Sequence, residues 1–213
     1  MAWIQKNIFF FFRLLTSLAL LACLAPAPAV PAKKAATGAS TLSLIPMEIR
    51  LVIRKSRYTL TLYRGNMPVK KYRAVFGRGY QDGDKRVNGD RRTPEGDFYI
   101  CTMNHSKRFY KFIGLSYPGL KHAQRGLQSK LITPEEYQAI NRAIAGRQPP
   151  PWDTRLGGAI GIHGRTLDGS DGSIATRYFS SSNWTDGCVA LGNADMDEIF
   201  SVVSLGTAVS ILP

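Results

Sequence analysis

The sequence predicts a mainly β domain with two or three short helices. Three observations lead to this fold class. Apolar and polar side chains alternate with a two-residue period through residues 49–62, which is typical of half-buried strands. Short runs of this kind recur along the chain and are separated by turns that contain glycine and proline. Only two segments combine the helical period with helix start and stop signals.

The first two predicted strands form a hairpin. Alternation places six apolar side chains on one face, namely Ile49, Leu51, Ile53, Tyr58, Leu60 and Leu62. A Thr-Pro-Glu-Gly turn at residues 93–96 separates two later strands. The remaining strands are expected at residues 68–79, 97–103, 159–162 and 206–213.

The first predicted helix carries a complete set of end signals. Thr133 is the expected N-cap, Pro134 occupies the first helical position, and Glu136 stands three residues after the cap. Gly146 follows the expected end of the helix. Its buried stripe is expected to contain Tyr137, Ile140 and Ile144.

The second predicted helix lies near the C-terminus. Asn193 is the expected N-cap, and the acidic residues that follow suit the positive end of the helix dipole. The side chains expected along its buried face are Met196, Ile199, Phe200 and Val203.

The N-terminal residues have the layout of a secretory signal. Lys6 and Arg13 precede an apolar run, Leu14–Leu24, and small residues and prolines follow. The run has 11 residues, whereas about 20 are needed to span a bilayer. Residues 1–24 are therefore interpreted as a signal peptide or, alternatively, an uncleaved anchor, and the protein is expected in the periplasm or cell envelope.

The rest of the chain divides into a tether and one domain. Residues 25–44 lack periodicity and are rich in Ala, Pro, Lys, Thr and Ser, which predicts a flexible linker. Residues 45–213 form the predicted folded domain. Cys23 stands in "LLAC", a loose match to a lipoprotein acylation site, so lipidation and removal with the signal are both left open. Contact with a membrane is expected only through an uncleaved or lipidated N-terminus.

The charge balance indicates an anionic partner. The chain has 28 Lys and Arg against 15 Asp and Glu, a formal net charge of +13. Such a surplus favours cell-wall polymer, a membrane surface or nucleic acid. The cations are scattered instead of clustered with aromatics, and no nucleic-acid-binding motif is present. Together with the export signal, this argues against nucleic acid.

Two residues stand out as candidates for nucleophilic catalysis. His163 ends an apolar strand at a glycine turn, and Cys188 follows Gly187 in the loop "SSSNWTDGCVALGN". A thiol is a poor nucleophile until it loses its proton, and an adjacent imidazole can accept that proton and hold the thiolate as an ion pair. A disulfide between Cys101 and Cys188 is the alternative in an oxidising compartment. The histidines and cysteines lack metal-ligand spacing, so no metal and no cofactor are expected.

At this point a family resemblance appears. The segments "TPEGDFYI", "SKRFYKFIGLSYPG", "GIHG", "TDGCVALGN" and "GTAVSILP" resemble the L,D-transpeptidase catalytic domain of bacterial cell-wall enzymes. The resemblance covers residues 47–213. It implies a β-sandwich or barrel-like domain, with Cys188 as nucleophile and His163 as its partner. Many members read Ser-His-Gly-Cys where this chain has Asp186 before the Gly-Cys pair, and the arginine that often follows the cysteine is absent here.

The resemblance implies acyl transfer on peptidoglycan stem peptides. Cys188 would attack the carbonyl that precedes the terminal D-alanine, with His163 as base and then as acid. The Gly187 and Cys188 N–H groups are candidate oxyanion donors. Either the Gly164 carbonyl or the Asp186 carboxylate would orient the imidazole, and Asp186 is alternatively a turn residue. The acceptor would be a second stem peptide, a cell-wall-linked protein or water.

Three further residues are candidate substrate contacts. Trp184 would line the groove or else pack against the core. Arg165 and Arg177 would meet stem-peptide carboxylates or else remain solvated charges. Residues 165–183 between the two motifs form either a mobile flap or an ordinary surface loop.

Two rival functions remain at this stage. One is a basic cell-wall-binding module without catalysis, which the presence of both Cys188 and His163 disfavours. The other is a sortase-like or other secreted cysteine peptidase. A sortase would have Thr-Leu-x-Thr before the cysteine and an arginine after it, and neither is clear in this sequence.

Overall fold

The computed structural model of the chain describes residues 48–168 and 182–213. These residues belong to one compact unit. The predicted signal peptide, the whole predicted linker, Cys23 and Arg177 lie outside the described residues, as does most of the loop between the two motifs.

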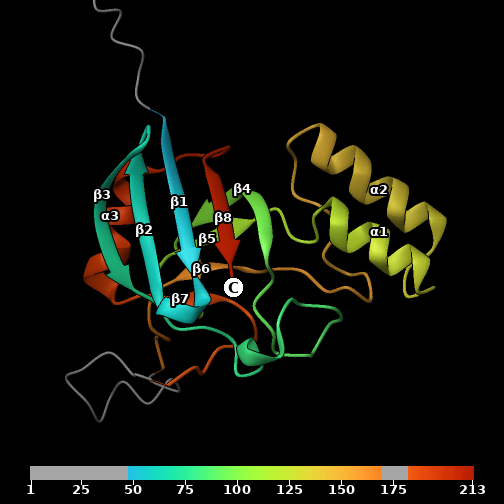
Figure 1. Cartoon of the computed structure of the whole chain (residues 1–213), viewed down its shortest axis with the longest axis horizontal. Coiled ribbons are helices and arrows are strands. Elements are labelled where there is room, and N and C mark those ends of the chain that lie inside the picture. The colour runs from blue at the N-terminus through green and yellow to red at the C-terminus, as the bar shows by residue number, and fades with distance from the viewer. Residues whose placement is uncertain (1–47, 169–181) are drawn as a thin grey trace, which may run out of the picture. The chain divides into compact units, whose positions relative to one another are not determined.

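The unit is built on an eight-stranded curled sheet (Figure 1). Its strand order is β3-β2-β1-β8-β4-β5-β6-β7. The strands are β1 (Ile49–Arg54), β2 (Thr59–Arg64), β3 (Met67–Arg73), β4 (Gly96–Asn104), β5 (Phe112–Leu115), β6 (Gly161–His163), β7 (Val189–Ala190) and β8 (Ala208–Leu212). Three α-helices and two 3-10 turns accompany them: α1 (Leu120–Gln128), α2 (Pro134–Ala145), α3 (Asn193–Val202), η1 (Lys55–Arg57) and η2 (Tyr80–Asp82). The mainly β prediction with two or three short helices is confirmed.

The predicted hairpin forms β1 and β2. The two strands pair antiparallel, with Leu51 opposite Leu62 and Ile53 opposite Leu60. All four side chains are buried, as the alternation predicts, because successive residues of a strand point to opposite faces. β1 also pairs in parallel with β8, so the C-terminal strand lies in the middle of the sheet.

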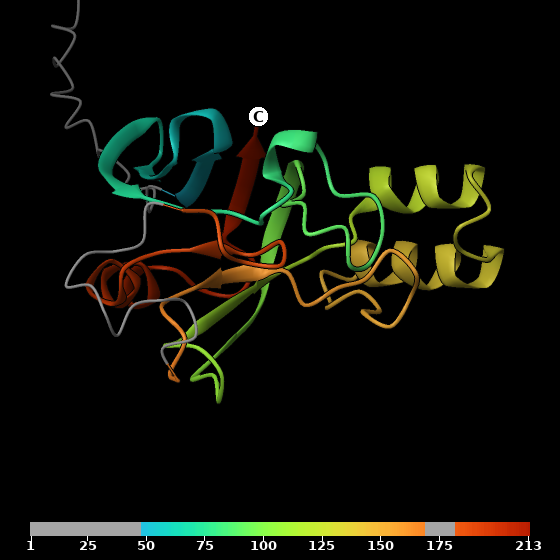
Figure 2. The ribbon, with the colours of Figure 1, turned by 90° about the horizontal axis from the view of Figure 1, so that it is seen from below.

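Strand β4 links the two halves of the sheet. Its first residues pair with β8, and after an irregularity between Ile100 and Thr102 its last residues pair with β5. The chain that follows β3 then reaches the opposite edge, where Val75 bridges to Ala190 and Gly77 bridges to Thr185. These two bridges join the segment after β3 to the β7 edge. Figure 2 shows how β1–β3 curl over one end of the unit. The large core cluster lies between these layers.

Helix α2 confirms the predicted capping box. The Thr133 side chain accepts from the Glu136 N–H, and the Glu136 carboxylate accepts from the Thr133 N–H. Ile140 is fully buried and Tyr137 and Ile144 are partly buried, so the predicted stripe faces the interior.

Helix α1 and strand β5 were not predicted. α1 lies beside α2 at one side of the sheet (Figures 1 and 2). The residues that α1 buries are His122, Ala123 and Gly126, which lack the large apolar stripe that reveals a helix in sequence. Its N-cap is Gly119, which supplies no capping side chain. Across the described ranges, no helix is long and apolar enough to cross a membrane.

Several element boundaries differ from the predictions, and the strand predicted at 68–79 ends at Arg73. Gly192 is the N-cap of α3 in place of Asn193, which is the first helical residue. The Asn193 side chain instead accepts a hydrogen bond from the Arg165 N–H at 2.9 Å. The predicted strand at 159–162 begins only at Gly161, because Ala159 has a left-handed φ of 51° that is incompatible with a strand.

Candidate active site

One cavity of about 410 Å³ holds both candidate catalytic residues. Cys188 and His163 line it together with Trp184, Thr185 and Asp186 from the loop before β7. Other walls come from the chain before β4, from the end of β4 and the turn that follows it, and from the segment before β6.

Strand pairing explains why Cys188 and His163 share this cavity. β6 and β7 run parallel, with Ile162 opposite Val189 and His163 opposite Ala190. Continued back by one residue, this register places Cys188 level with Gly161. Because side chains alternate along a strand, Cys188 and His163 then lie on the same face of neighbouring strands. Two motifs 25 positions apart in sequence thereby meet at one edge of the sheet.

A hydrogen bond and two aromatic rings contact the His163 ring. Its Nδ1 lies 2.6 Å from the Gly164 carbonyl oxygen. The ring stacks on Phe109 with centroids 3.8 Å apart and meets Trp184 edge-on at 5.6 Å. In a neutral imidazole one nitrogen donates and the other accepts. Donation from Nδ1 to Gly164 therefore leaves Nε2 as the basic nitrogen.

Gly164 has a steric requirement as well as a carbonyl. A Cβ at this position would lie 2.6 Å from Asn193 Oδ1 and 2.7 Å from the Tyr110 carbonyl oxygen. Real Cβ atoms essentially never approach so closely, so only glycine fits. The Gly164 N–H donates to the same Tyr110 carbonyl at 2.8 Å.

The Cys188 sulfur forms no disulfide, and its surroundings favour the thiol form. Burial raises the pKa of the Cys188 thiol to about 11, while a hydrogen bond from the Gly161 N–H and the charges of Lys85 and Arg108 act in the opposite direction. Its Sγ lies 3.6 Å from the Ala159 carbonyl oxygen. Burial thus opposes the thiolate–imidazolium pair expected from the sequence, and that pair remains a prediction.

The disulfide left open by the sequence does not form. Cys101 and Cys188 are both free, and Cys101 is buried in β4. Burial raises the pKa of the Cys101 thiol to about 11, which keeps this residue unreactive.

Thr185 organises the turn that carries Cys188. Its hydroxyl donates to the Cys188 carbonyl at 2.7 Å and accepts from the Gly187 N–H at 3.2 Å. Gly187 has a φ of 134°, and a Cβ there would lie 2.8 Å from the Arg92 carbonyl oxygen. The Gly187 N–H is thus engaged within the turn, which leaves Cys188 as the better of the two predicted oxyanion donors.

The Asp186 carboxylate lies near two arginines. Its side chain is 64% exposed and lies 4.0 Å from the Arg78 guanidinium and 3.8 Å from that of Arg91. Of the two orienting groups considered, the Gly164 carbonyl is the one in contact with His163.

The three predicted substrate contacts have different outcomes. Trp184 lines the cavity. Arg165 is not among the described residues that line it, and its backbone N–H bonds to Asn193. Arg177 lies outside the described residues.

Sequence reasoning missed the cations on the cavity wall. Lys85 is 2% exposed, and Arg78 and Arg108 are exposed lining residues. The Lys85 ammonium bonds to Asp90 at 2.7 Å and to the Val87 carbonyl oxygen at 3.1 Å. Only the general basic excess signalled such a surface. Within residues 48–168 and 182–213, no cluster of three or more His, Cys, Asp or Glu side chains offers a metal site.

Comparison with known proteins gives one family match. The sequence profile of the L,D-transpeptidase catalytic domain matches residues 48–211 of this chain. No curated protein matches it.

Solved structures provide a likeness of fold. The helical cell shape determining protein Pgp2 from Campylobacter jejuni is 20% identical with a TM-score of 0.50, and the match covers 77% of this chain and 47% of that one. An L,D-transpeptidase from Mycobacterium smegmatis is 12% identical with a TM-score of 0.46, over 78% and 59% of the two chains. L,D-transpeptidase 1 from Mycobacterium tuberculosis is 12% identical with a TM-score of 0.43, over 78% and 62%. The matches thus cover 47–62% of the length of these structures.

Proposed function

The chain belongs to the L,D-transpeptidase catalytic domain family, and on this premise we propose that it is a peptidoglycan acyltransferase with Cys188 as nucleophile. The substrate is a stem tetrapeptide, and the bond broken joins the diamino acid to the terminal D-alanine. Residues 1–24 direct export, so the reaction takes place in the periplasm or cell envelope.

The first step forms a thioester. The Cys188 sulfur attacks the diamino-acid carbonyl while His163 Nε2 takes the thiol proton. Because burial raises the pKa of the Cys188 thiol to about 11, the proton leaves as the new bond forms and not before. The carbon–nitrogen bond then breaks, and the imidazolium returns the proton to the departing amine of D-alanine.

The environment of His163 supports this role. The hydrogen bond to the Gly164 carbonyl and the stacked Phe109 ring fix the imidazole plane. A fixed ring loses little freedom when the reaction begins, which favours proton transfer at a defined position. The Cys188 N–H is the proposed oxyanion donor, and Trp184 is a proposed wall for the stem peptide.

The second step consumes the thioester. An amine from a second stem peptide or a cell-wall-linked protein gives a cross-link or an attached protein, and water gives a trimmed stem peptide. The observation that carries the proposal is that Cys188 and His163 lie on one face of neighbouring strands and line the same cavity.

Release of D-alanine tests the proposal. The purified chain is incubated with tetrapeptide-bearing muropeptides, and free D-alanine is measured against a Cys188→Ala variant. We expect release by the parent chain and none above background by the variant. Equal release from both, or none from either, would contradict the proposal. The second result, combined with retained binding to peptidoglycan, would support the rival binding module.

A further inference from the structure

Lys85 presents a buried charge to the cavity that holds Cys188. It lines the cavity and is 2% exposed. An ammonium has three donors. Two of the Lys85 donors bond to Asp90 Oδ1 and the Val87 carbonyl oxygen, and the third has no acceptor among the described residues. One N–H is therefore available to a ligand.

Asp90 does not cancel this charge completely. Its carboxylate also accepts three backbone N–H groups, from Arg86 at 2.7 Å, Val87 at 3.0 Å and Arg92 at 3.0 Å. Burial would raise the pKa of Asp90, but the bonds from Lys85 and these N–H groups lower it, so the carboxylate stays ionised. Its negative charge is shared among four donors, which leaves the ammonium able to attract a second anion.

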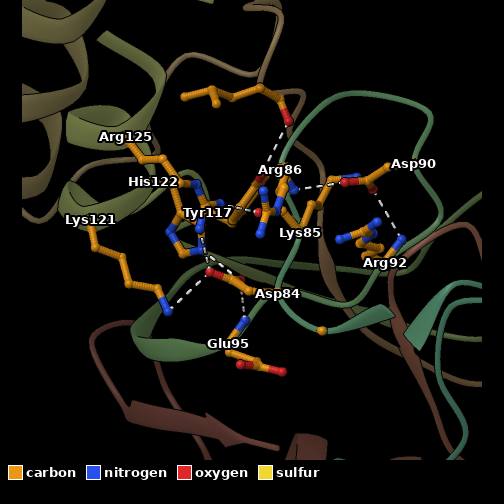
Figure 3. Close-up of polar contacts among 12 residues, drawn as sticks. Asp84, Lys85, Arg86, Asp90, Arg92, Glu95, Tyr117, Lys121, His122 and Arg125 are labelled. Carbon is orange, nitrogen blue, oxygen red and sulfur yellow. Dashed lines mark hydrogen bonds and ion pairs between the residues drawn. The ribbon is translucent and has the colours of Figure 1, made fainter. Parts of the chain in front are cut away.

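A second network fixes the backbone next to Lys85 (Figure 3). Asp84 accepts from His122 at 3.0 Å and from Arg125 at 3.0 Å, and it lies 3.1 Å from the Lys121 ammonium. The Arg125 guanidinium also bonds to the Lys85 carbonyl oxygen. Helix α1 therefore anchors the loop on both sides of the Asp84–Lys85 peptide, so the position of the ammonium is set before any ligand arrives.

The surrounding charges favour an anion. Arg78 and Arg108 also line the cavity. Asp186 is the one carboxylate among its described lining residues, and Arg78 and Arg91 face it. The positive charges of Lys85 and Arg108 lie close enough to act on the Cys188 sulfur. An anionic group bound here would thus lie near the reacting atom.

We propose that Lys85, assisted by Arg108, binds the free carboxylate of the departing D-amino acid. The inference rests on the proposed function. In the substrate, only the amide nitrogen and one α-carbon separate the attacked carbonyl carbon from the terminal carboxyl carbon. Standard bond lengths keep these two carbons at most about 4.3 Å apart. An anion site in the cavity that also holds the sulfur is consistent with this requirement.

The proposal defines substrate choice. A stem that ends one residue after the scissile bond presents its terminal carboxylate to Lys85. A stem with one more residue, or with an amide at this end, leaves the buried ammonium without its second anion. The enzyme would therefore select stems by the position of the chain end, and Lys85 would be its specificity-determining residue.

The first test compares two substrates that differ by one charge. Values of kcat/KM are measured for a stem tetrapeptide with a free terminal carboxylate and for its terminal amide. We expect the parent chain to prefer the acid by about 10–100-fold, the range for a charge-assisted hydrogen bond. In Lys85→Met the preference should fall to within about threefold, and in the matched control Lys70→Met it should not change. Lys70 is an exposed cation paired with Glu198, and neither residue is among the described residues that line the cavity.

The second test does not depend on stem-peptide chemistry. Alkylation rates of Cys188 by iodoacetate and by iodoacetamide are compared, with free cysteine as reference. Iodoacetate places a carboxylate two bonds from the sulfur in its product. The ratio of the iodoacetate rate to the iodoacetamide rate should therefore be at least fivefold higher for the parent chain than for free cysteine. Lys85→Met should lose this advantage.

A double variant controls for misfolding of Lys85→Met. Lys85→Met leaves the Asp90 carboxylate without its cation, so Lys85→Met/Asp90→Asn is measured beside it, with thermal unfolding of each. If neither variant folds, the acid–amide comparison and the alkylation comparison on the parent chain still test whether the cavity binds a carboxylate.

The outcomes separate this inference from the proposed function. Turnover of acid and amide at equal rates, with an alkylation ratio equal to that of free cysteine, would overturn the Lys85 site and leave the acyl transfer intact. An iodoacetate preference that Lys85→Met abolishes, in a chain that releases no D-alanine, would support the anion site and overturn the proposed function.

Discussion

The two functional sides of the cavity, one with Cys188 and His163 and one with Lys85, are positioned by different kinds of contact. The Cys188 and His163 side is positioned by backbone groups, including the Gly164 carbonyl and the Gly161 N–H, and by stacked aromatic rings. The Lys85 side is positioned by ionised side chains, chiefly Asp84 and Asp90. Backbone hydrogen bonds do not titrate, whereas carboxylates do.

This difference predicts that the two sides of the cavity lose their arrangement under different conditions. The nucleophile and its base depend on close packing, so substitutions that add volume should damage them most. The Lys85 side depends on carboxylates that remain ionised. Low pH and substitutions that remove charge should therefore damage it most. The experiments below separate the two, beginning with the largest expected effect.

Removal of the base gives the largest expected effect. His163→Gln should lower kcat for D-alanine release by about 10²–10⁴-fold, the usual contribution of a general acid–base group. The measurement is single-turnover release from a stem tetrapeptide. His105→Gln is the control, because His105 is exposed, contacts the Phe200 ring and is not among the described residues that line the cavity. Equal losses in both variants would show that the effect is not specific to the site.

Adding one methyl group tests the packed side. Gly164→Ala should lower the free energy of unfolding by about 2–3 kcal/mol, because its Cβ would overlap Asn193 and Tyr110. Chemical denaturation provides the measurement. At Gly192 a Cβ would meet only Asp195, at an ordinary 3.5 Å, so Gly192→Ala should cost about 1 kcal/mol or less. If the two substitutions cost the same, the tight fit at Gly164 is not important.

Neutralising Asp84 tests the charged side. Burial would raise the pKa of Asp84, but hydrogen bonds from His122, the Glu95 N–H and Arg125 hold it well below its usual range. Its stabilisation is therefore present at neutral pH and is lost as the pH falls below about 4.

Asp84→Asn should accordingly lower the free energy of unfolding by about 1–3 kcal/mol at pH 7. The difference from the parent chain should shrink as the pH approaches about 2. Asp153→Asn, at an exposed position, is the control. A difference that stays constant from pH 7 to pH 2 would contradict the assignment.

The smallest expected effect links the two sides. The alkylation rate of Cys188 should titrate near pH 11, because burial raises the thiol pKa to about 11. Since the charge of Lys85 lowers this pKa, Lys85→Met should move the midpoint upward. Stopped-flow alkylation over pH 7–12 measures it. A parent midpoint below pH 8 would instead indicate a resting thiolate.

Local signals were sufficient for much of the fold. The β1–β2 hairpin and the capping box of α2 depend on neighbours in sequence, and both were predicted. Helix α1 escaped because it buries His122, Ala123 and Gly126, and small or polar side chains produce no apolar stripe. Asn193 was misplaced by one residue, because its side chain serves the distant Arg165 backbone and not its own helix.

The candidate site shows the same division. His163 and Cys188 were found because each stands in a distinctive glycine-flanked motif. Lys85 was missed, since a lysine in a polar loop normally indicates a solvated charge. Its burial depends on Asp90 and on helix α1, which sequence alone did not bring together. Arg165 was proposed from proximity in sequence, but it is not among the described lining residues.

Intact-mass analysis of the chain after brief exposure to a stem tetrapeptide tests the central claim most directly. We predict an adduct equal to the tetrapeptide minus D-alanine, mapped to Cys188 by peptide sequencing and absent from Cys188→Ala. An unmodified parent chain under conditions where D-alanine is released, or an adduct that persists in Cys188→Ala, would contradict the account.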